Sequence, residues 1–99
     1  MGYSLILAFY GLTTSKLNNY LRLNYTAMYD ETYKKLGLSI KKYRRLRGLT
    51  QEKLAESIDV SLDFMGKIEI AYSRPSLNTL IAIANALDIP LKALFDFED

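Results

Sequence analysis

Between residues 36 and 95, apolar residues recur at the three- and four-residue spacing of amphipathic helices. The spacing predicts five helices in succession, each with one face turned toward a shared core. The inward positions are Leu36, Ile40 and Tyr43 in the first helix, Leu54, Ala55 and Ile58 in the second, Met65 and Ile68 in the third, Leu77, Leu80, Ile81 and Ala84 in the fourth, and Leu91, Leu94 and Phe95 in the fifth. The pattern therefore predicts an all-α domain.

Residues that favour helix termini stand at the ends of these helices. Thr50, Ser61 and Ser76 each precede a predicted helix, where a side-chain oxygen can accept a hydrogen bond from a free backbone N–H. Gly48 follows the first helix near Arg47 and supplies its stop. Pro90 begins the fifth helix, in keeping with the preference of proline for a first turn. The predicted helices are thus short and have defined ends.

The second and third helices are separated by a short turn at Asp59 and Val60. Two helices joined by three or four residues form the unit that places its second helix in the major groove of DNA. Ala55 fits this unit, because the two helices cross closely there and a larger side chain would push them apart. The order and spacing of these features indicate a helix-turn-helix.

The same residues carry a resemblance to a known family. Its motif positions are Ile40, Arg44, Gly48, Leu49, Thr50, Gln51, Leu54, Ala55, Val60, Ser61, Ile68, Glu69, Pro75, Ser76, Leu77 and Leu80. Through them, residues 36–95 resemble the Cro/phage-repressor-like helix-turn-helix family, also called the xenobiotic-response-element (XRE) family. The resemblance covers about three fifths of the chain and none of residues 1–27. It implies a five-helix, lambda-repressor-like DNA-binding domain.

The resemblance also implies roles for three polar residues. Arg44 and Glu69 occupy the positions of a partly buried ion pair that ties the first helix to the end of the third. We expect this pair to be structural, since removing one partner of a buried pair costs ~3–5 kcal/mol. Gln51 occupies a position that touches a DNA phosphate and the start of the recognition helix. The alternative for Gln51 is an exposed residue that merely favours the helix.

The third helix is the recognition helix that the resemblance implies. Its candidate DNA contacts are Ser61, Leu62, Asp63, Phe64, Gly66 and Lys67. Lys67 can donate to guanine or to phosphate, Asp63 can accept from cytosine N4, and Leu62 can meet a thymine methyl. Asp63 is also favoured near a helix N-terminus without any ligand, and Gly66 is equally compatible with a neutral surface position. No Arg, Asn or Gln lies between residues 61 and 69, so the strong bidentate readers are absent.

The loop after the third helix holds further candidate DNA contacts. Tyr72, Ser73 and Arg74 are expected to contact phosphates and so fix register rather than sequence. A packing role is the alternative for Tyr72. Asp59 and Ala71 stand at turns where the family commonly has glycine. Aspartate tolerates the left-handed conformation, whereas alanine pays roughly 1–2 kcal/mol for it.

Residues 1–27 differ in character from residues 28–99, which we predict to form the helix-turn-helix domain. An apolar run from Leu5 to Tyr10 and an alternation at Leu21, Leu23 and Tyr25 predict a short β-hairpin, with a helix from Ser15 onward as the alternative. The apolar run is too short to span a bilayer, because a membrane-spanning helix needs roughly 20 residues, so no membrane partner is expected. This N-terminal arm is either native or an upstream extension.

Composition narrows the classes of function. The chain has 99 residues, enough for one modest core, and it has neither cysteine nor histidine. The usual general base, the cysteine nucleophile and the commonest metal ligands are therefore missing, so we expect no enzyme, cofactor or metal. Seven cations and no acid lie between residues 34 and 47, whereas four acids and one lysine lie between residues 88 and 99. Such separation favours a polyanion as partner, although basic residues also simply solvate a helix.

Together these features predict a sequence-specific DNA-binding transcriptional regulator of the small repressor or antitoxin type. We expect a cytoplasmic, nucleoid-associated homodimer on double-stranded DNA, with each third helix in a major groove. The fifth helix and residues 1–27 are candidate dimer surfaces. No further domain is expected after Asp99, so control would come from concentration, dimerisation or a protein partner. The alternative is a protein-interaction module that keeps the scaffold without reading bases.

Overall fold

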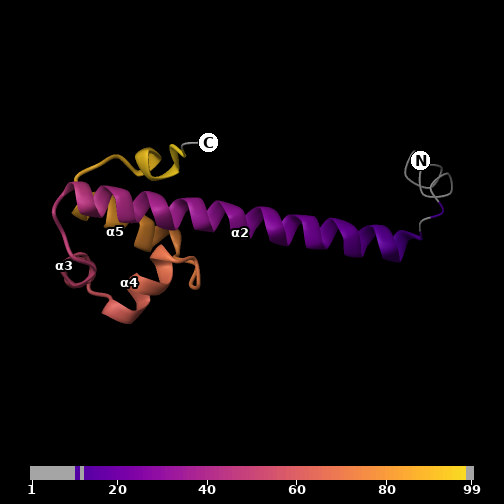
Figure 1. Cartoon of the computed structure of the whole chain (residues 1–99), viewed down its shortest axis with the longest axis horizontal. Helices are drawn as coiled ribbons and strands as arrows, with labels where there is room; N and C mark the ends of the chain where they lie inside the picture. Colours follow the sequence, from indigo (N-terminus) through magenta and orange to yellow (C-terminus); the bar gives the residue numbers. More distant parts are fainter. Residues whose placement is uncertain (1–10, 12, 98–99) are drawn as a thin grey trace. The chain divides into compact units, whose positions relative to one another are not determined.

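The computed structural model describes residues 11 and 13–97, and the side chains among them other than those of residues 20 and 23–28. The described residues form four α-helices, α2 (Thr14–Leu46), α3 (Gln51–Ser57), α4 (Leu62–Glu69) and α5 (Leu77–Ala86), followed by the 3₁₀ helix η1 (Leu91–Phe95). They contain no strand, so the all-α, five-helix prediction is confirmed for this part of the chain (Figure 1). The chain divides into two compact units, residues 1–30 and 31–99.

In the N-terminal unit, residues 14–30 belong to α2. The strand predicted around Leu21 is therefore wrong, and the alternative of a helix from Ser15 is the better description. An alternation of three apolar residues is weak evidence for a strand when no Gly or Pro interrupts the sequence between residues 14 and 36. Thr13 starts the helix, since its Oγ1 accepts a hydrogen bond from Lys16 N at 3.1 Å. The other half of the predicted hairpin, residues 5–10, lies outside the described residues.

The first helix ends near Arg47 as predicted, but it begins much earlier than the motif suggested. α2 runs without a break through residues 27 and 28, where we placed the boundary of the helix-turn-helix domain. That boundary stays a prediction.

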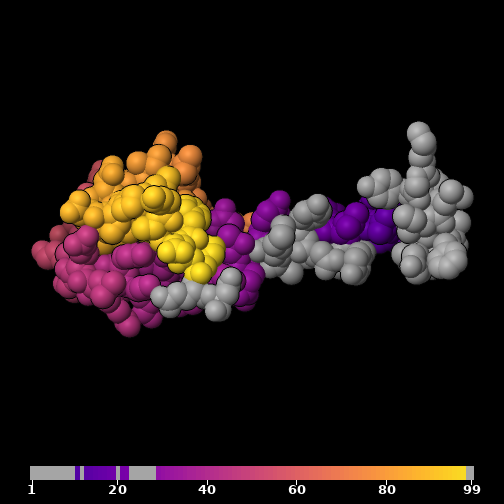
Figure 2. All heavy atoms as spheres, turned by 90° about the horizontal axis from the view of Figure 1, so that it is seen from above, coloured from indigo at the N-terminus to yellow at the C-terminus, as the bar shows by residue number. Residues whose placement is uncertain are grey.

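In the unit of residues 31–99, buried apolar side chains from each helix form a single core. The buried apolar residues are Leu36, Ile40, Leu54, Ala55, Met65, Ile68, Leu80, Ile83, Ala84, Leu87 and Leu94. Most of them were predicted from helical spacing. Figure 2 shows the C-terminal segment (yellow) beside the part of α2 drawn in magenta, where Phe97 and Lys35 line the same small cavity.

Three residues predicted to face inward do not. Leu77 and Ile81 in α5 are 60% and 40% exposed, while Ile83 and Leu87 are buried in their place. The buried stripe of α5 thus begins one turn later than predicted, because Leu77 is the first residue of the helix and its first turn lies beyond the core. Phe95 is 42% exposed at the end of η1.

The predicted caps are all present. The Oγ1 of Thr50 accepts from Lys53 N at 3.1 Å, and the Oγ of Ser61 accepts from Phe64 N at 3.0 Å. Ser76 Oγ accepts from Thr79 N at 3.2 Å. Each bond satisfies an N–H that the first helical turn leaves without a partner. The starts of α3, α4 and α5 are therefore fixed locally by sequence.

Left-handed residues end the helices, and only one of the four in this unit is glycine. Gly48 has φ +69° after α2, and Asp59 (φ 56°), Ala71 (φ 62°) and Asp88 (φ 55°) follow α3, α4 and α5. Asp59 and Ala71 adopt the conformation expected from the turn pattern. Alanine has no side-chain oxygen to offset the steric cost, so the turn after α4 is a local source of strain.

A glycine sets the distance between α2 and the end of α4. A Cβ added to Gly37 would lie only 2.5 Å from the carbonyl oxygen of Glu69 and 2.8 Å from that of Ile68. These atoms are backbone and cannot move away cheaply. Gly37 therefore permits a close approach that brings the last turn of α4 against α2.

Candidate nucleic-acid interface

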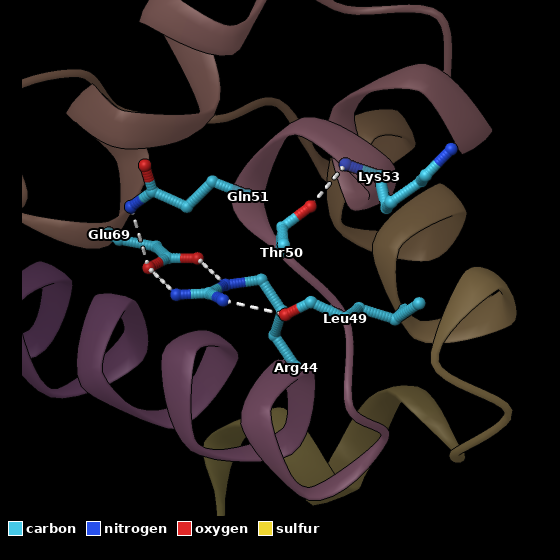
Figure 3. A network of polar contacts seen from close by, with 6 residues as sticks. All are labelled: Arg44, Leu49, Thr50, Gln51, Lys53 and Glu69. Carbon is cyan, nitrogen blue, oxygen red and sulfur yellow. Dashed lines mark hydrogen bonds and ion pairs between the residues drawn. The ribbon is translucent and has the colours of Figure 1, made fainter.

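A buried ion pair joins α2 to the end of α4 (Figure 3). Arg44 Nε donates to Glu69 Oε2 at 2.6 Å and Arg44 Nη2 donates to Glu69 Oε1 at 3.0 Å. The side chains are only 8% and 1% exposed. Arg44 Nη1 also donates to the carbonyl of Leu49 at 2.8 Å, which fixes the segment leading into α3. The two-point geometry suits arginine because its donors form a rigid fork.

Gln51 extends this network from the first turn of α3. Its Nε2 donates to Glu69 Oε1 at 3.0 Å, so Glu69 accepts from α2 and α3 at once (Figure 3). Its Oε1 lies against α4, since a Cβ added to Gly66 would meet that atom at 3.6 Å. Gln51 is half-buried and spans the two helices of the helix-turn-helix. It therefore holds the angle at which α4 is presented.

The side chains of α4 divide into a core face and a solvent face. Met65 and Ile68 are buried, and Phe64 packs partly against the core. Of the candidate DNA contacts, Ser61, Leu62 and Asp63 are exposed, while Gly66 and Lys67 are intermediate. The face available to a ligand thus consists mainly of Leu62, Asp63 and Lys67, with Phe64 turned toward the core.

Lys67 is already paired in the free protein. Its Nζ lies 2.8 Å from Asp63 Oδ2, one helical turn earlier, with side-chain exposures of 41% and 75%. The same ammonium lies 5.6 Å from the centre of the Tyr72 ring. The spacing of Asp63 and Lys67 is that of a stabilising helical pair, so the sequence held a signal for this contact. The sequence analysis predicts separate base contacts for Asp63 and Lys67, without this pairing.

The loop after α4 folds back on the helix that precedes it. The backbone N–H groups of Tyr72 and Ser73 both donate to the carbonyl of Lys67, at 2.8 and 3.1 Å. The Tyr72 side chain is 76% exposed, so it is available to a ligand on all but the side facing Lys67. The Arg74 guanidinium lies 4.8 Å from the centre of the Tyr33 ring in α2. The three predicted phosphate contacts thus lie on a loop anchored at both ends.

The basic run of α2 has more than one task. Arg47 donates from Nε to the carbonyl of Leu87 at 2.7 Å and from Nη2 to that of Asp88 at 3.0 Å. It thereby satisfies carbonyls at the end of α5, a contact that sequence reasoning missed. With Arg44 also held inside, the run is less purely a polyanion surface than its charge suggests.

Two lysines of the run do flank the helix-turn-helix. Lys34 and Lys41 line an open groove of about 340 Å³ together with Leu38, Gln51, Glu69 and Ile70. The groove lies where the first turn of α3 meets the end of α4. Cations beside a helix N-terminus favour an anionic ligand.

Two further features are absent from the described residues, a membrane-spanning helix and a metal-binding cluster. No helix there is long and apolar enough to cross a membrane. Within the same residues, no cluster of three or more acidic residues could hold a metal ion.

The capped helices α3 and α4, held at a fixed angle by Gln51 and Glu69, define a helix-turn-helix protein. Residues 40–94, more than half of the chain, match the model of the Helix-turn-helix family HTH_3. The chain belongs to this family, as the resemblance to Cro and phage repressors implied.

Relatives named as repressors or transcriptional regulators agree with this class. Over 59 residues the chain is 42% identical to an immunity repressor protein of Bacillus phage phi105, covering 60% of this chain and 41% of the relative. It is 38% identical over 61 residues to an uncharacterised HTH-type transcriptional regulator of Rickettsia conorii, covering 62% of this chain and 49% of the relative. The chain therefore spans less than half the length of these curated relatives.

Solved structures give the same fold. The restriction-modification controller protein C.AhdI of Aeromonas hydrophila superimposes with a TM-score of 0.62 at 32% identity, covering 64% of this chain and 96% of that one. An HTH_3 family transcriptional regulator of Vibrio cholerae gives a TM-score of 0.63 at 30% identity, covering 67% of this chain and 37% of that one. The relatives and solved structures named here are repressors, controllers or regulators of transcription or restriction-modification.

Proposed function

We propose that this protein is a sequence-specific DNA-binding transcriptional regulator that reads DNA with α4. The observation that carries the proposal is the solvent face of α4, Leu62, Asp63 and Lys67, presented by a helix whose other end is fixed through Glu69. A helix held in a fixed position, with exposed side chains along its solvent face, can enter a major groove and contact base edges. Family membership and the names of the relatives support the same function.

Phosphate contacts would supply most of the affinity. Tyr72, Ser73 and Arg74 lie on the anchored loop after α4, and Lys34 and Lys41 flank the groove beside Gln51. Because Gln51 Nε2 is engaged by Glu69, contact with a phosphate would come from the first turn of α3 as a whole. Neutralised phosphates release counterions, so binding should weaken steeply as salt rises.

A homodimer is part of the proposal. Two copies would place their α4 helices in successive major grooves, with half-sites one helical turn apart at ~34–36 Å. The predicted dimer surface on η1 needs revision, because Leu94 is fully buried within the monomer. The half-exposed Leu91 and Phe95 remain available on η1, and Leu77 and Ile81 of α5 are also exposed. Such a regulator would act in the cytoplasm at the nucleoid.

Selection of bound sequences from a random DNA pool, with the mass of the complex measured by light scattering, tests this function. A palindrome with half-sites about ten base pairs apart, and a mass of two chains per site, is the expected result. Lys67→Ala should change the selected sequence or the salt slope. Lys92→Ala, which removes an exposed charge at the proposed dimer surface on η1 and outside α4, should keep the same selected half-site. Failure to retain any DNA at low salt would overturn the proposal.

A protein-interaction module is the second candidate. It is favoured by the exposed apolar side chains Leu38, Leu62 and Ile70, which are 62%, 50% and 72% exposed. Leu38 and Ile70 line the same groove as Lys34 and Lys41, a combination that also suits an acidic, partly apolar protein segment. Retention of DNA without enrichment of any sequence would favour this candidate over the regulator.

A further inference from the structure

The ion pair on the solvent face of α4 has a geometry that matches the edge of a base pair. Asp63 Oδ2 and Lys67 Nζ lie 2.8 Å apart, which places one acceptor and one donor side by side. Across the middle of the major-groove edge, each base pair also presents one acceptor and one donor. These are guanine O6 beside cytosine N4, or thymine O4 beside adenine N6.

The spacing of the two sets of atoms is the same for a physical reason. The keto oxygen and the amino nitrogen of a base pair are joined by a pairing hydrogen bond of about 2.9 Å. The amino group keeps its second hydrogen free in the groove, and the keto oxygen keeps a free lone pair. Lys67 Nζ can therefore donate to the keto oxygen while Asp63 Oδ2 accepts from the amino group, without breaking either pair.

From this match, and resting on the proposed function, we infer that Asp63 and Lys67 read one base pair of each half-site as a unit. The pair recognises which strand carries the keto base. Guanine is preferred over thymine on the strand that Lys67 faces, because the ammonium can also donate to guanine N7, where thymine has a methyl group. The same pair in the opposite orientation, C·G or A·T, would place donor against donor and acceptor against acceptor.

Two features of the free protein suit this role. The contact of Lys67 with the Tyr72 ring restricts the long lysine side chain, so less conformational freedom is lost on binding. The two charges cancel, so the pair adds little to attraction for phosphates in general. Its contribution is therefore to discrimination between sequences rather than to affinity for all DNA.

Exchange of the two residues tests the inference. The double variant Asp63→Lys with Lys67→Asp keeps the net charge and reverses the order of donor and acceptor. Selection from a random DNA pool should give guanine at one position of the half-site for the wild type. The exchanged variant should select the complementary base, cytosine, at that position. The disfavoured orientation should bind on the order of tenfold more weakly in each case.

A second exposed pair provides the matched control. Lys53 and Glu56 in α3 lie 3.7 Å apart with side chains 69% and 61% exposed, and their exchange also preserves net charge. Lys53→Glu with Glu56→Lys should leave the selected base unchanged, whatever its effect on affinity for all sequences, because phosphate contacts made by the first turn of α3 do not read bases. The melting temperatures of all variants establish that each is folded, and the single variants Asp63→Ala and Lys67→Ala provide a second route. Each single variant removes one of the two contacts and should therefore reduce the preference for keto over amino at that position.

The outcomes separate the inference from the function on which it rests. A wild type that enriches no sequence overturns the proposed function, and the inference with it. A wild type that enriches a sequence, with an exchanged variant that keeps the same base or loses the preference without inverting it, overturns the paired reading alone. So does an Asp63→Ala variant that binds every sequence more tightly while selecting the wild-type base, since Asp63 would then only repel phosphates.

Discussion

Two ion pairs involve residues of α4, and their surroundings differ sharply. Arg44–Glu69 is buried, bidentate and supported by hydrogen bonds to Leu49 and Gln51. Asp63–Lys67 is exposed and joins two side chains of the same helix. The buried pair is costly to break because a lone charge would be left in a poorly solvated place. The exposed pair opens cheaply, because water replaces each partner. On the same short helix, the buried pair fixes the position of the backbone, whereas the exposed pair remains accessible to other polar groups.

The largest expected loss of stability follows removal of Glu69 from the buried pair. Glu69→Ala removes one partner and leaves Arg44 buried without its carboxylate, so we expect a loss of ~3–5 kcal/mol in the free energy of unfolding. Urea denaturation followed by circular dichroism measures this loss. Glu56→Ala, which removes an exposed carboxylate of α3, is the control and should change stability by less than about 0.5 kcal/mol. Equal effects of the two variants would show that burial does not distinguish these carboxylates.

Gly37 tests how closely the buried end of α4 is held. Gly37→Ala would place a Cβ 2.5 Å from the Glu69 carbonyl, and we expect the overpacking to cost about 1–3 kcal/mol. Gly66→Ala is the matched control at the exposed face of α4. There the nearest atom is the Gln51 side chain at 3.6 Å, and helix propensity should make the change stabilising by up to about 1 kcal/mol. The expected opposite signs can be read from the two thermal midpoints.

The turn that follows the buried pair carries removable strain. Ala71 has φ 62°, so Ala71→Gly should raise the free energy of unfolding by about 1 kcal/mol. Ala82→Gly, in the middle of α5, is the matched change in a right-handed helix and should lower it by about the same amount. An unchanged or lower melting temperature for Ala71→Gly would mean that alanine is not strained in this turn.

The smallest effect on stability is expected at the exposed pair. Lys67→Ala should lower the free energy of unfolding by only about 0.2–0.5 kcal/mol, because the lysine belongs to an exposed (i, i+4) pair. The effect of Lys67→Ala on the DNA sequences selected should nevertheless be larger than its effect on stability. A loss of several kcal/mol in a denaturation experiment would place Lys67 among the structural residues and remove the contrast with Arg44.

Most of the scaffold could be predicted because it depends on local chemistry. Thr50, Ser61 and Ser76 cap the helices whose starts they mark, since a cap needs only its own neighbouring N–H groups. Contacts that depend on distant backbone could not be predicted. Arg47 donates to carbonyls some 40 residues later in the chain, and no feature of the sequence around Arg47 indicates those partners. Gly37 is a similar case, because its close approach exists only once α4 is packed.

The errors in prediction also have local causes. The strand around Leu21 rested on a short alternation that a continuous helix overrode. The apolar character of Leu77 predicts that its side chain points into the core, but Leu77 is exposed because the first turn of α5 lies beyond the core. Of the candidate DNA contacts, the exposure of Leu62 and Asp63 followed from helical spacing. The pairing of Asp63 with Lys67 was readable from the same spacing, but only when the two residues are considered together.

The anchoring of α4 at its last residue has a practical consequence for protein engineering. Gly37, Arg44 and Gln51 hold the helix through Glu69 and its carbonyl, and none of these contacts involves Leu62, Asp63 or Lys67. The outward positions of α4 can therefore be substituted without removing the contacts that hold the helix in place. In libraries randomised at those three positions, a large fraction of the variants should fold. This small domain is therefore a practical scaffold for selecting new DNA-binding specificities.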